Sequence, residues 1–82
     1  MKILKKSVFQ YIGNTGTENW PTSEMKADID ENGNFKLEMS MFNSSEFFSN
    51  ETQREEVIDF MTQVLDKAKE LADEVAARYK EN

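Results

Sequence analysis

Apolar residues in the C-terminal part of the chain recur at the spacing of one helical face. Between residues 50 and 80 no Pro or Gly interrupts the sequence, and apolar positions alternate four and three residues apart. Asn50 is a favourable N-cap residue, and Gln53 stands at the position of its capping-box partner. The sequence therefore predicts one long amphipathic helix over residues 50–80. Its apolar face consists of two neighbouring rows, with Val57, Met61, Val64, Ala68, Leu71 and Val75 in the first and Ile58, Leu65, Ala72 and Tyr79 in the second.

A strict alternation of apolar and polar residues precedes the helix, over residues 24–41. This is the period of an antiparallel sheet with one buried face, and Asn32-Gly33 in its middle is a strong hairpin signal. A three-residue loop ending at Gly33 sets apolar residues opposite apolar ones and basic residues opposite acidic ones, whereas a two-residue loop would set Ile29 opposite Lys36. We therefore expect Gly33 at positive φ and paired residue numbers that sum to 64. The expected pairs are Ile29–Phe35, Ala27–Leu37, Met25–Met39, Lys26–Glu38 and Asp28–Lys36.

The N-terminal segment, residues 2–12, fits two kinds of structure. Its β-branched and aromatic residues favour a strand, and Gly13 ends the run. A helix remains the alternative, because four of the apolar residues also fit a helical spacing. These four are Leu4, Val8, Tyr11 and Ile12. The strand is the favoured interpretation.

Residues 13–23 and 42–49 are expected to connect these elements. The first segment holds two of the three Gly, the only Pro and the only Trp, which is typical of a loop. The second begins with a turn sequence and then contains Phe47 and Phe48, which we expect to pack under the sheet edge or the first helical turn. The order strand, loop, hairpin, linker and helix predicts a single α+β domain. It would consist of a small antiparallel sheet of about three strands with the long helix packed on one face.

Catalysis and metal binding have little support in the sequence. The 82 residues contain no Cys and no His, which removes thiolate chemistry, the usual base near neutral pH and the commonest metal ligand. Residues 28–33 match the first half of a calcium-binding loop, but Met39 stands where such a loop needs a bidentate Glu. The predicted hairpin accounts for the same residues as ordinary turn formers. We therefore expect neither an enzyme nor a metal site nor a cofactor.

The net charge of −6 is unevenly distributed. The first twelve residues carry three Lys and no acidic residue, which leaves −9 for the remaining seventy. An acidic protein repels nucleic acid and anionic membranes and attracts basic protein surfaces. No apolar run is long enough to span a bilayer, and the N-terminal Lys residues are not followed by the apolar region of a signal peptide. We therefore expect a soluble cytoplasmic protein that binds another protein and does not bind nucleic acid directly.

Two features indicate partner binding. One side of the predicted helix carries acidic residues within a sector of roughly 60° at 100° per residue, and Trp20 lies in the Gly-rich loop. The acidic residues are Glu55, Asp59, Asp66, Glu70 and Asp73. The plainer interpretations are a solvated helix face with internal ion pairs and a Trp that folds back over the core. The binding hypothesis is a small acidic inhibitor that occupies a basic, nucleic-acid-handling groove of its partner by mimicking nucleic acid, as phage or mobile-element inhibitors do.

A homodimerising structural or adaptor module is the second hypothesis. A helix of 31 residues is about 46 Å long, whereas a strand of seven residues spans about 23 Å. The helix is therefore expected to project beyond the sheet, unless it bends near residues 67–69 and folds back. Its continuing apolar stripe would be an exposed patch in a monomer. The expected dimer interface consists of Ala68, Leu71, Ala72, Val75 and Tyr79.

Overall fold

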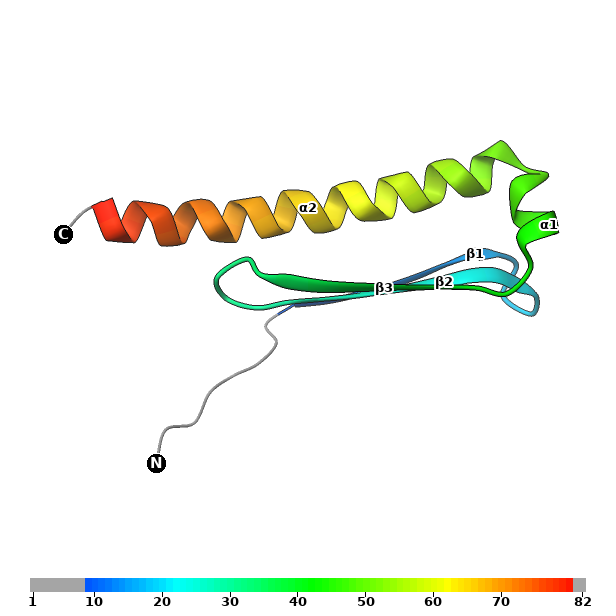
Figure 1. Ribbon diagram of the computed structural model, residues 1–82, viewed down its shortest axis with the longest axis horizontal. Coiled ribbons are helices and arrows are strands. Elements are labelled where there is room, and N and C mark those ends of the chain that lie inside the picture. Colours follow the sequence, from blue (N-terminus) through cyan, green and yellow to red (C-terminus); the bar gives the residue numbers. More distant parts are fainter. Residues whose placement is uncertain (1–8, 81–82) are drawn as a thin grey trace, which may run out of the picture.

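A three-stranded antiparallel sheet lies beneath one long helix (Figure 1). The computed structural model describes residues 9–80. The strands are β1 (Phe9–Gly16), β2 (Pro21–Ile29) and β3 (Phe35–Met41), in the spatial order β1-β2-β3, and the helices are α1 (Ser44–Phe48) and α2 (Glu51–Lys80). The expected α+β class, with a C-terminal helix on one sheet face, is confirmed. None of the helices within the described range combines the length and the apolar character that a membrane span requires.

The register of the β2–β3 hairpin is the expected one, with paired residue numbers that sum to 64. At its turn, Oδ1 of Asp30 accepts hydrogen bonds from the backbone N–H groups of Asn32 and Asn34, at 2.9 and 3.0 Å. The N–H of Gly33 donates to the Asp30 carbonyl at 3.1 Å, and Gly33 has φ +88. The Asp30 side chain therefore holds the turn closed, and Gly33 supplies the left-handed backbone that the three-residue loop requires.

The loop expected over residues 13–23 is wrong at both of its ends. Strand β1 continues to Gly16 and β2 begins at Pro21, so that only four residues connect them. Gly13 pairs with Met25 and Thr15 with Ser23, which extends the first hairpin by two further pairs of buried or half-buried positions. Strand rather than helix is confirmed from residue 9 onward, whereas residues 2–8 of the predicted strand lie outside the described residues.

The linker expected over residues 42–49 contains the short helix α1 instead of a turn alone. Oδ1 of Asn43 accepts a hydrogen bond from the N–H of Glu46 at 3.1 Å and caps this helix. Phe47 is buried beneath it, as expected, but Phe48 is exposed. Only one of the two aromatic residues therefore belongs to the core.

The start of α2 follows the prediction, but its capping box does not form. Oδ1 of Asn50 accepts a hydrogen bond from the N–H of Thr52 at 2.9 Å, as an N-cap side chain does. Gln53, the expected capping-box partner, is buried instead, and its side-chain carbonyl accepts a hydrogen bond from the Thr22 hydroxyl. The helix is thus tied to β2 through Gln53.

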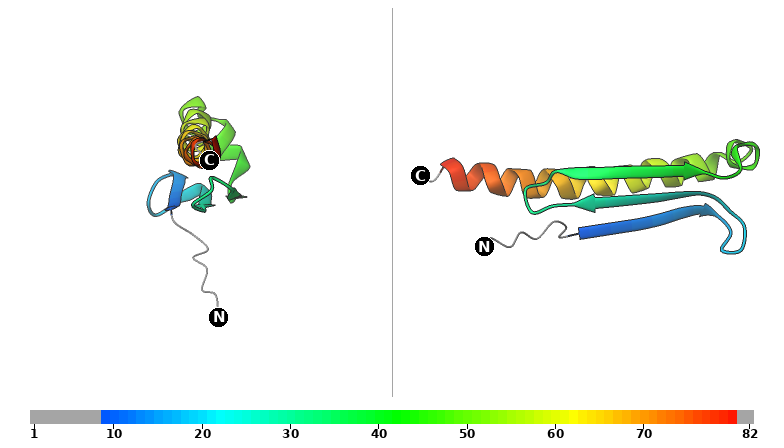
Figure 2. Two further views of the ribbon diagram at one scale, coloured as in Figure 1. Left: turned by 90° about the vertical axis from the view of Figure 1, so that its left-hand side faces the viewer. Right: turned by 60° about the horizontal axis from the view of Figure 1, so that its bottom comes forward.

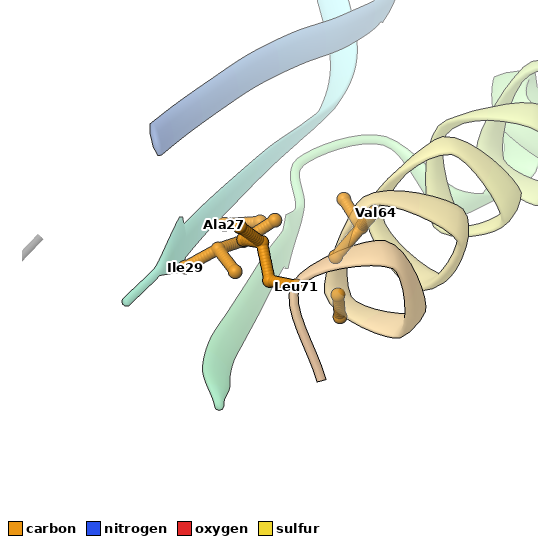
Figure 3. Close-up of a cluster of buried hydrophobic side chains, with 5 residues drawn as sticks. Ala27, Ile29, Val64 and Leu71 are labelled. Atoms are coloured by element: carbon orange, nitrogen blue, oxygen red, sulfur yellow. The ribbon is translucent and has the colours of Figure 1, made fainter. Parts of the chain in front are cut away.

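The apolar core is a small cluster between α2 and the first two strands (Figure 3). Ala68 and Leu71, which the length argument placed beyond the sheet, belong to this core, with exposed fractions of 6% and 8%. The reason is that the β2–β3 turn curls against the helix: a Cβ on Gly33 would lie 2.9 Å from the backbone N of Ala72. The helix neither bends nor folds back, and it projects past the turn only by its last turns (Figure 1). Of the seven buried apolar residues in the described part of the chain, five form this cluster: Ala27, Ile29, Val64, Ala68 and Leu71.

Helix α2 covers β1 and β2 and leaves β3 to one side (Figure 2). Phe60 packs over Gly13, where a Cβ would lie 3.0 Å from the Phe60 ring, and Nζ of Lys67 lies 4.3 Å from the centroid of the Phe9 ring. The apolar residues of β3 that share the inner face are only partly covered. Phe35 remains 41% and Met39 45% exposed. The helix therefore sits off-centre, toward the β1 edge.

Candidate functional site

Apolar side chains are unusually numerous on the surface of this chain. Among the described residues, eleven large apolar side chains are exposed, whereas the core contains seven buried apolar residues. Most of the exposed ones form two groups, and groups of this kind mark contact surfaces more often than scattered single residues do. The first group, at the α1 end, is Trp20, Phe42 and Phe48; the second, beside β3, is Phe35, Met39, Met41, Ile58, Met61 and Leu65.

Trp20 does not fold back over the core, so the plainer interpretation of this residue is wrong. Its side chain is 82% exposed. The β1–β2 connection that carries it is closed by reciprocal backbone hydrogen bonds between Thr17 and Trp20, at 3.2 and 3.3 Å, and the Thr17 hydroxyl accepts a further bond from the Trp20 N–H at 3.1 Å. The indole ring is therefore presented to solvent from a tight, hydrogen-bonded turn.

A cleft of about 580 Å³ lies beside Trp20, where the β1–β2 connection meets α1 and the first turn of α2. Trp20, Pro21 and Phe42 give it apolar walls, and Glu46 and Gln53 give it polar ones. This lining suits a docking side chain with an apolar body and a basic or amide end. The full lining is Gly16, Thr17, Trp20, Pro21, Phe42, Asn43, Glu46 and Gln53.

A buried chain of hydroxyl groups fixes the shape of this end of the molecule. Because the Thr22 hydroxyl donates to Gln53, it accepts from Thr15 at 2.6 Å, and Thr15 in turn accepts from Ser23 at 2.6 Å. No buried side-chain N or O atom within residues 9–80 lacks a hydrogen-bond partner. Satisfied buried networks of this kind are rigid. The sequence pattern does not indicate this network, because its Thr and Ser residues stand in the Gly-rich stretch that predicts a loop.

The acidic face of α2 divides into two halves with different charge balance. Glu70 lies 3.3 Å from Nζ of Lys67, and Asp73 lies 2.6 Å from Nζ of Lys69, so both are paired within the helix. Asp73 correspondingly raises the pKa of Lys69, chiefly by accepting its hydrogen bond. The ion pairs of the described residues do not include the other three acidic residues, which are all exposed: Glu55, Asp59 and Asp66.

The sequence itself shows the same division. Residues 51–66 carry five carboxylates against one cation, whereas residues 67–80 carry three carboxylates against four cations. The negative potential of α2 therefore belongs to its first half, the half that adjoins α1 and the cleft. The acidic residues of this half are Glu51, Glu55, Glu56, Asp59 and Asp66.

The five residues expected to form a helical dimer interface do not share one free surface. Ala68 and Leu71 are covered by the chain's own sheet, Val75 is half-buried, and only Ala72 and Tyr79 are exposed. Val75 and Tyr79 border a shallow depression of about 240 Å³ together with Asn32 of the hairpin turn. The uncovered part of this region is smaller than the sequence indicates.

No cluster of three or more potential metal ligands occurs within the described residues. Asp30, the central acid of the calcium-loop pattern, already accepts two backbone hydrogen bonds within the turn.

Comparison with known proteins gives no match to any family, to any curated protein or to any solved structure.

Proposed function

We propose that this chain is a non-enzymatic protein that binds a basic surface of another protein through its α1 end. In this proposal the Trp20 ring is the anchor, and the acidic first half of α2 supplies the attraction. The observation that carries the proposal is the 82% exposure of Trp20 on a rigid turn beside an open cleft. Trp20 lies beside further exposed aromatic residues, and grouped exposed apolar residues mark contact sites more often than single ones do. Trp is also enriched among the residues that dominate binding energy.

The division of charge supports this choice of surface. Because Glu70 and Asp73 already pair with Lys67 and Lys69, they contribute little net potential. Residues 51–66 contain five carboxylates and a single cation, Arg54. Glu46 adds a further negative charge at the cleft. An acidic surface of this kind accelerates association with a basic partner, and its effect weakens as salt rises.

The specific form of the proposal is an inhibitor that occupies a groove built for nucleic-acid phosphates. Residues 51–66 extend over about 24 Å of helix, and their five carboxylates lie at unequal intervals that average about 6 Å along the axis. A single nucleic-acid strand carries one charge per about 3.4 Å. The first half of α2 therefore presents a comparable, somewhat sparser line of charge, as small inhibitors from phages or mobile elements would require.

The test is capture of partners from the native host by the intact chain and by matched variants, read by quantitative mass spectrometry. Reversal of Glu55, Asp59 and Asp66 to Lys, or Trp20→Ala, should remove the same partner that the unmodified chain retains at low salt. The control reverses Glu70, Asp73 and Glu74 to Lys on the other half of α2 and should retain that partner. The expected partner is a nucleic-acid-binding protein.

The proposal fails if both sets of reversals act alike, or if a captured partner survives both the triple reversal and Trp20→Ala. Circular dichroism establishes that each variant is folded, which is expected because exposed charges contribute under about 1 kcal/mol each. Competition between the chain and a nucleic acid for the captured partner then tests the inhibitor form separately.

The second candidate function, a homodimeric module joined through the C-terminal half of α2, has weaker support. Two of its five contact residues, Ala68 and Leu71, are in the core. The variant Tyr79→Glu tests what remains, because this side chain is 76% exposed and its substitution leaves the core and the contact between Ala72 and the hairpin turn intact. A fall in the mass measured by light scattering would favour this interface, and an unchanged mass would exclude it.

A further inference from the structure

Strand β3 forms one free edge of the described sheet. The N–H of Asp30 bonds to the carbonyl of Asn34 at 2.9 Å, and the N–H of Phe42 bonds to the carbonyl of Thr22 at 2.8 Å. Both are pairs of even-numbered residues in the β2–β3 register. Because bonding alternates along an antiparallel pair, the even-numbered residues of β3 bond to β2, and its odd-numbered residues direct their N–H and C=O groups to the free edge. An edge of this kind is a template for another strand.

The apolar face next to this edge is also uncovered. Phe35, Met39 and Met41 are exposed, although they lie on the same sheet face as the buried Met25, Ala27 and Ile29. On α2, Phe60 and Lys67 face β1, whereas Ala68 and Ala72 face the β2–β3 turn. At 100° per residue, the exposed row of Ile58, Met61 and Leu65 lies on this second side, toward β3. The exposed apolar residues of α2 and β3 thus form one continuous strip, which consists of Ile58, Met61 and Leu65 on α2 and Phe35, Met39 and Met41 on β3.

We propose that a second copy of this chain binds the edge of β3, so that two β3 strands pair antiparallel about a two-fold axis at Leu37. The two sheets then form one six-stranded sheet with both α2 helices on the same face. The strips of the two copies meet at the axis and cover each other's apolar residues. This inference does not depend on the proposed partner surface, because Trp20 and the outer face of α2 lie away from the β3 edge.

The outer face of β3 is what selects a second copy as the occupant. With the axis at Leu37, paired residue numbers sum to 74, so Lys36 of each copy lies opposite Glu38 of the other. Each row across the four central strands then alternates in sign, because Asp28 is the cross-strand neighbour of Lys36, and Lys26 that of Glu38, within one copy. In a single copy Lys36 and Glu38 form an ion pair with each other at 2.9 Å, and in the dimer each also lies opposite a residue of opposite charge. Opposite charges across strands stabilise a sheet, and like charges destabilise it.

The neighbouring register is disfavoured by the same residues. An axis at Glu38 would set this residue opposite its own copy, which places like charges together. An axis at Leu37 also sets Phe35 opposite Met39 of the second copy on the apolar face, and all of these odd-numbered residues have backbone groups directed to the edge. Charge therefore selects the axis at Leu37, and apolar contact and backbone hydrogen bonding are compatible with it.

The first test is the mass in solution, measured by light scattering at tens of micromolar. The unmodified chain should have twice the 9.5 kDa of one copy. Met39→Pro removes an N–H that is directed to the free edge and not to β2, so it should return the mass to that of one copy while the fold, read by circular dichroism, survives. Ile12→Pro places the same substitution at the outward N–H of β1, the opposite edge, and should leave the mass doubled.

The second test fixes the register without disrupting the edge. The chain has no Cys, so Lys36→Cys and a tagged Glu38→Cys protein can be mixed and mildly oxidised. Directly opposed residues that are not hydrogen-bonded to each other lie about 4.5 Å apart between Cα atoms, within disulfide reach, whereas the diagonal pairs are about 7–8 Å apart. The mixture should form a crosslinked dimer in high yield, and neither variant should do so alone.

Each alternative result overturns the inference in a different way. A mass of one copy for the unmodified chain excludes the dimer. Loss of the dimer in Ile12→Pro, with Met39→Pro unaffected, assigns it to the β1 edge. Efficient crosslinking of Glu38→Cys alone places the axis at Glu38 and refutes the charge argument.

Discussion

Replacement of Gly33 by Ala should destabilise the protein more than its place in an exposed turn would indicate. The backbone there has φ +88, and a non-Gly residue in the left-handed region costs roughly 1–2 kcal/mol. A second cost comes from the helix. A Cβ at this position would meet the Ala68 carbonyl oxygen closely and would lie 2.9 Å from the Ala72 N and 3.2 Å from the Ala72 Cβ. Two of these three atoms belong to the helical backbone and cannot move aside.

The hairpin turn must therefore withdraw from α2 to accommodate the methyl group. Leu71, which is 8% exposed in the core beneath the turn, would then regain part of its contact with water. Full burial of a Leu side chain is worth about 1.5–3 kcal/mol, so partial exposure costs about 1 kcal/mol. Together with the φ cost this gives about 2–3 kcal/mol, which for a domain of this size lowers the melting temperature by about 10–20 °C.

Thermal unfolding followed by circular dichroism measures this shift, and Gly33→Asn separates the two costs. Asn tolerates positive φ better than Ala does, but it carries the same Cβ. If contact with the helix contributes as argued, Asn should remain clearly destabilising. A melting temperature within a few degrees of the unmodified chain for Gly33→Ala would refute both the turn geometry and its contact with α2. Full recovery in Gly33→Asn would refute the contact alone.

Three further results are expected. Gln53→Ala should reduce the free energy of unfolding in urea by about 1–3 kcal/mol, because the buried Thr22 hydroxyl loses its acceptor. Millimolar calcium should leave the melting temperature unchanged, since the Asp30 carboxylate is engaged by the turn; a rise of several degrees that magnesium does not reproduce would contradict this. In an NMR titration the pKa of Glu38 should lie below its usual value, chiefly because its carboxylate accepts a hydrogen bond from Lys36 and also because of the Lys36 charge. Lys36→Met should reduce this shift, because both of these causes are then removed. The pKa of Glu38 is lower in the folded protein than in the unfolded chain. The stability that this ion pair contributes is therefore present above the pKa of the unfolded chain, and it is lost as the pH falls through the pKa of the folded protein.

The second hairpin could be predicted to the residue because several independent constraints agreed. The alternation over residues 24–41 fixed which side chains share a face, and Asn32-Gly33 located the turn. The charges then distinguished two loop lengths, since only one set Lys26 opposite Glu38. The observed register and the positive φ of Gly33 match this prediction. Where pattern, turn chemistry and cross-strand pairs all apply, a single sequence is sufficient.

The first hairpin could not be recognised in the same way, because the inner positions of β1 nearest its turn are not apolar. Gly13 and Thr15 occupy places where the alternation would need large apolar residues, and both are ordinarily signs of a loop. At Gly13 a Cβ would lie 3.0 Å from the Phe60 ring, so a larger residue could fit only if this ring shifted. Thr15 is buried because hydroxyl groups on β2 satisfy it. Both reasons lie in residues distant in sequence, so no local pattern contains them.

The position of α2 across the sheet explains why the β3 surface was also beyond prediction. The alternation in β3 is the same whether its apolar face is covered by the chain's own helix or by a second copy. The reason is that a period-two pattern indicates only which face of a strand is apolar. The small residue at Gly13 lets Phe60 approach β1, and this draws the helix toward that edge and away from Phe35 and Met39. The sequence therefore specified an apolar face of three strands and a helix wide enough for two of them. The remaining strand is where the apolar surface is left open, which is why we propose the dimer contact at β3 and not at the end of the helix.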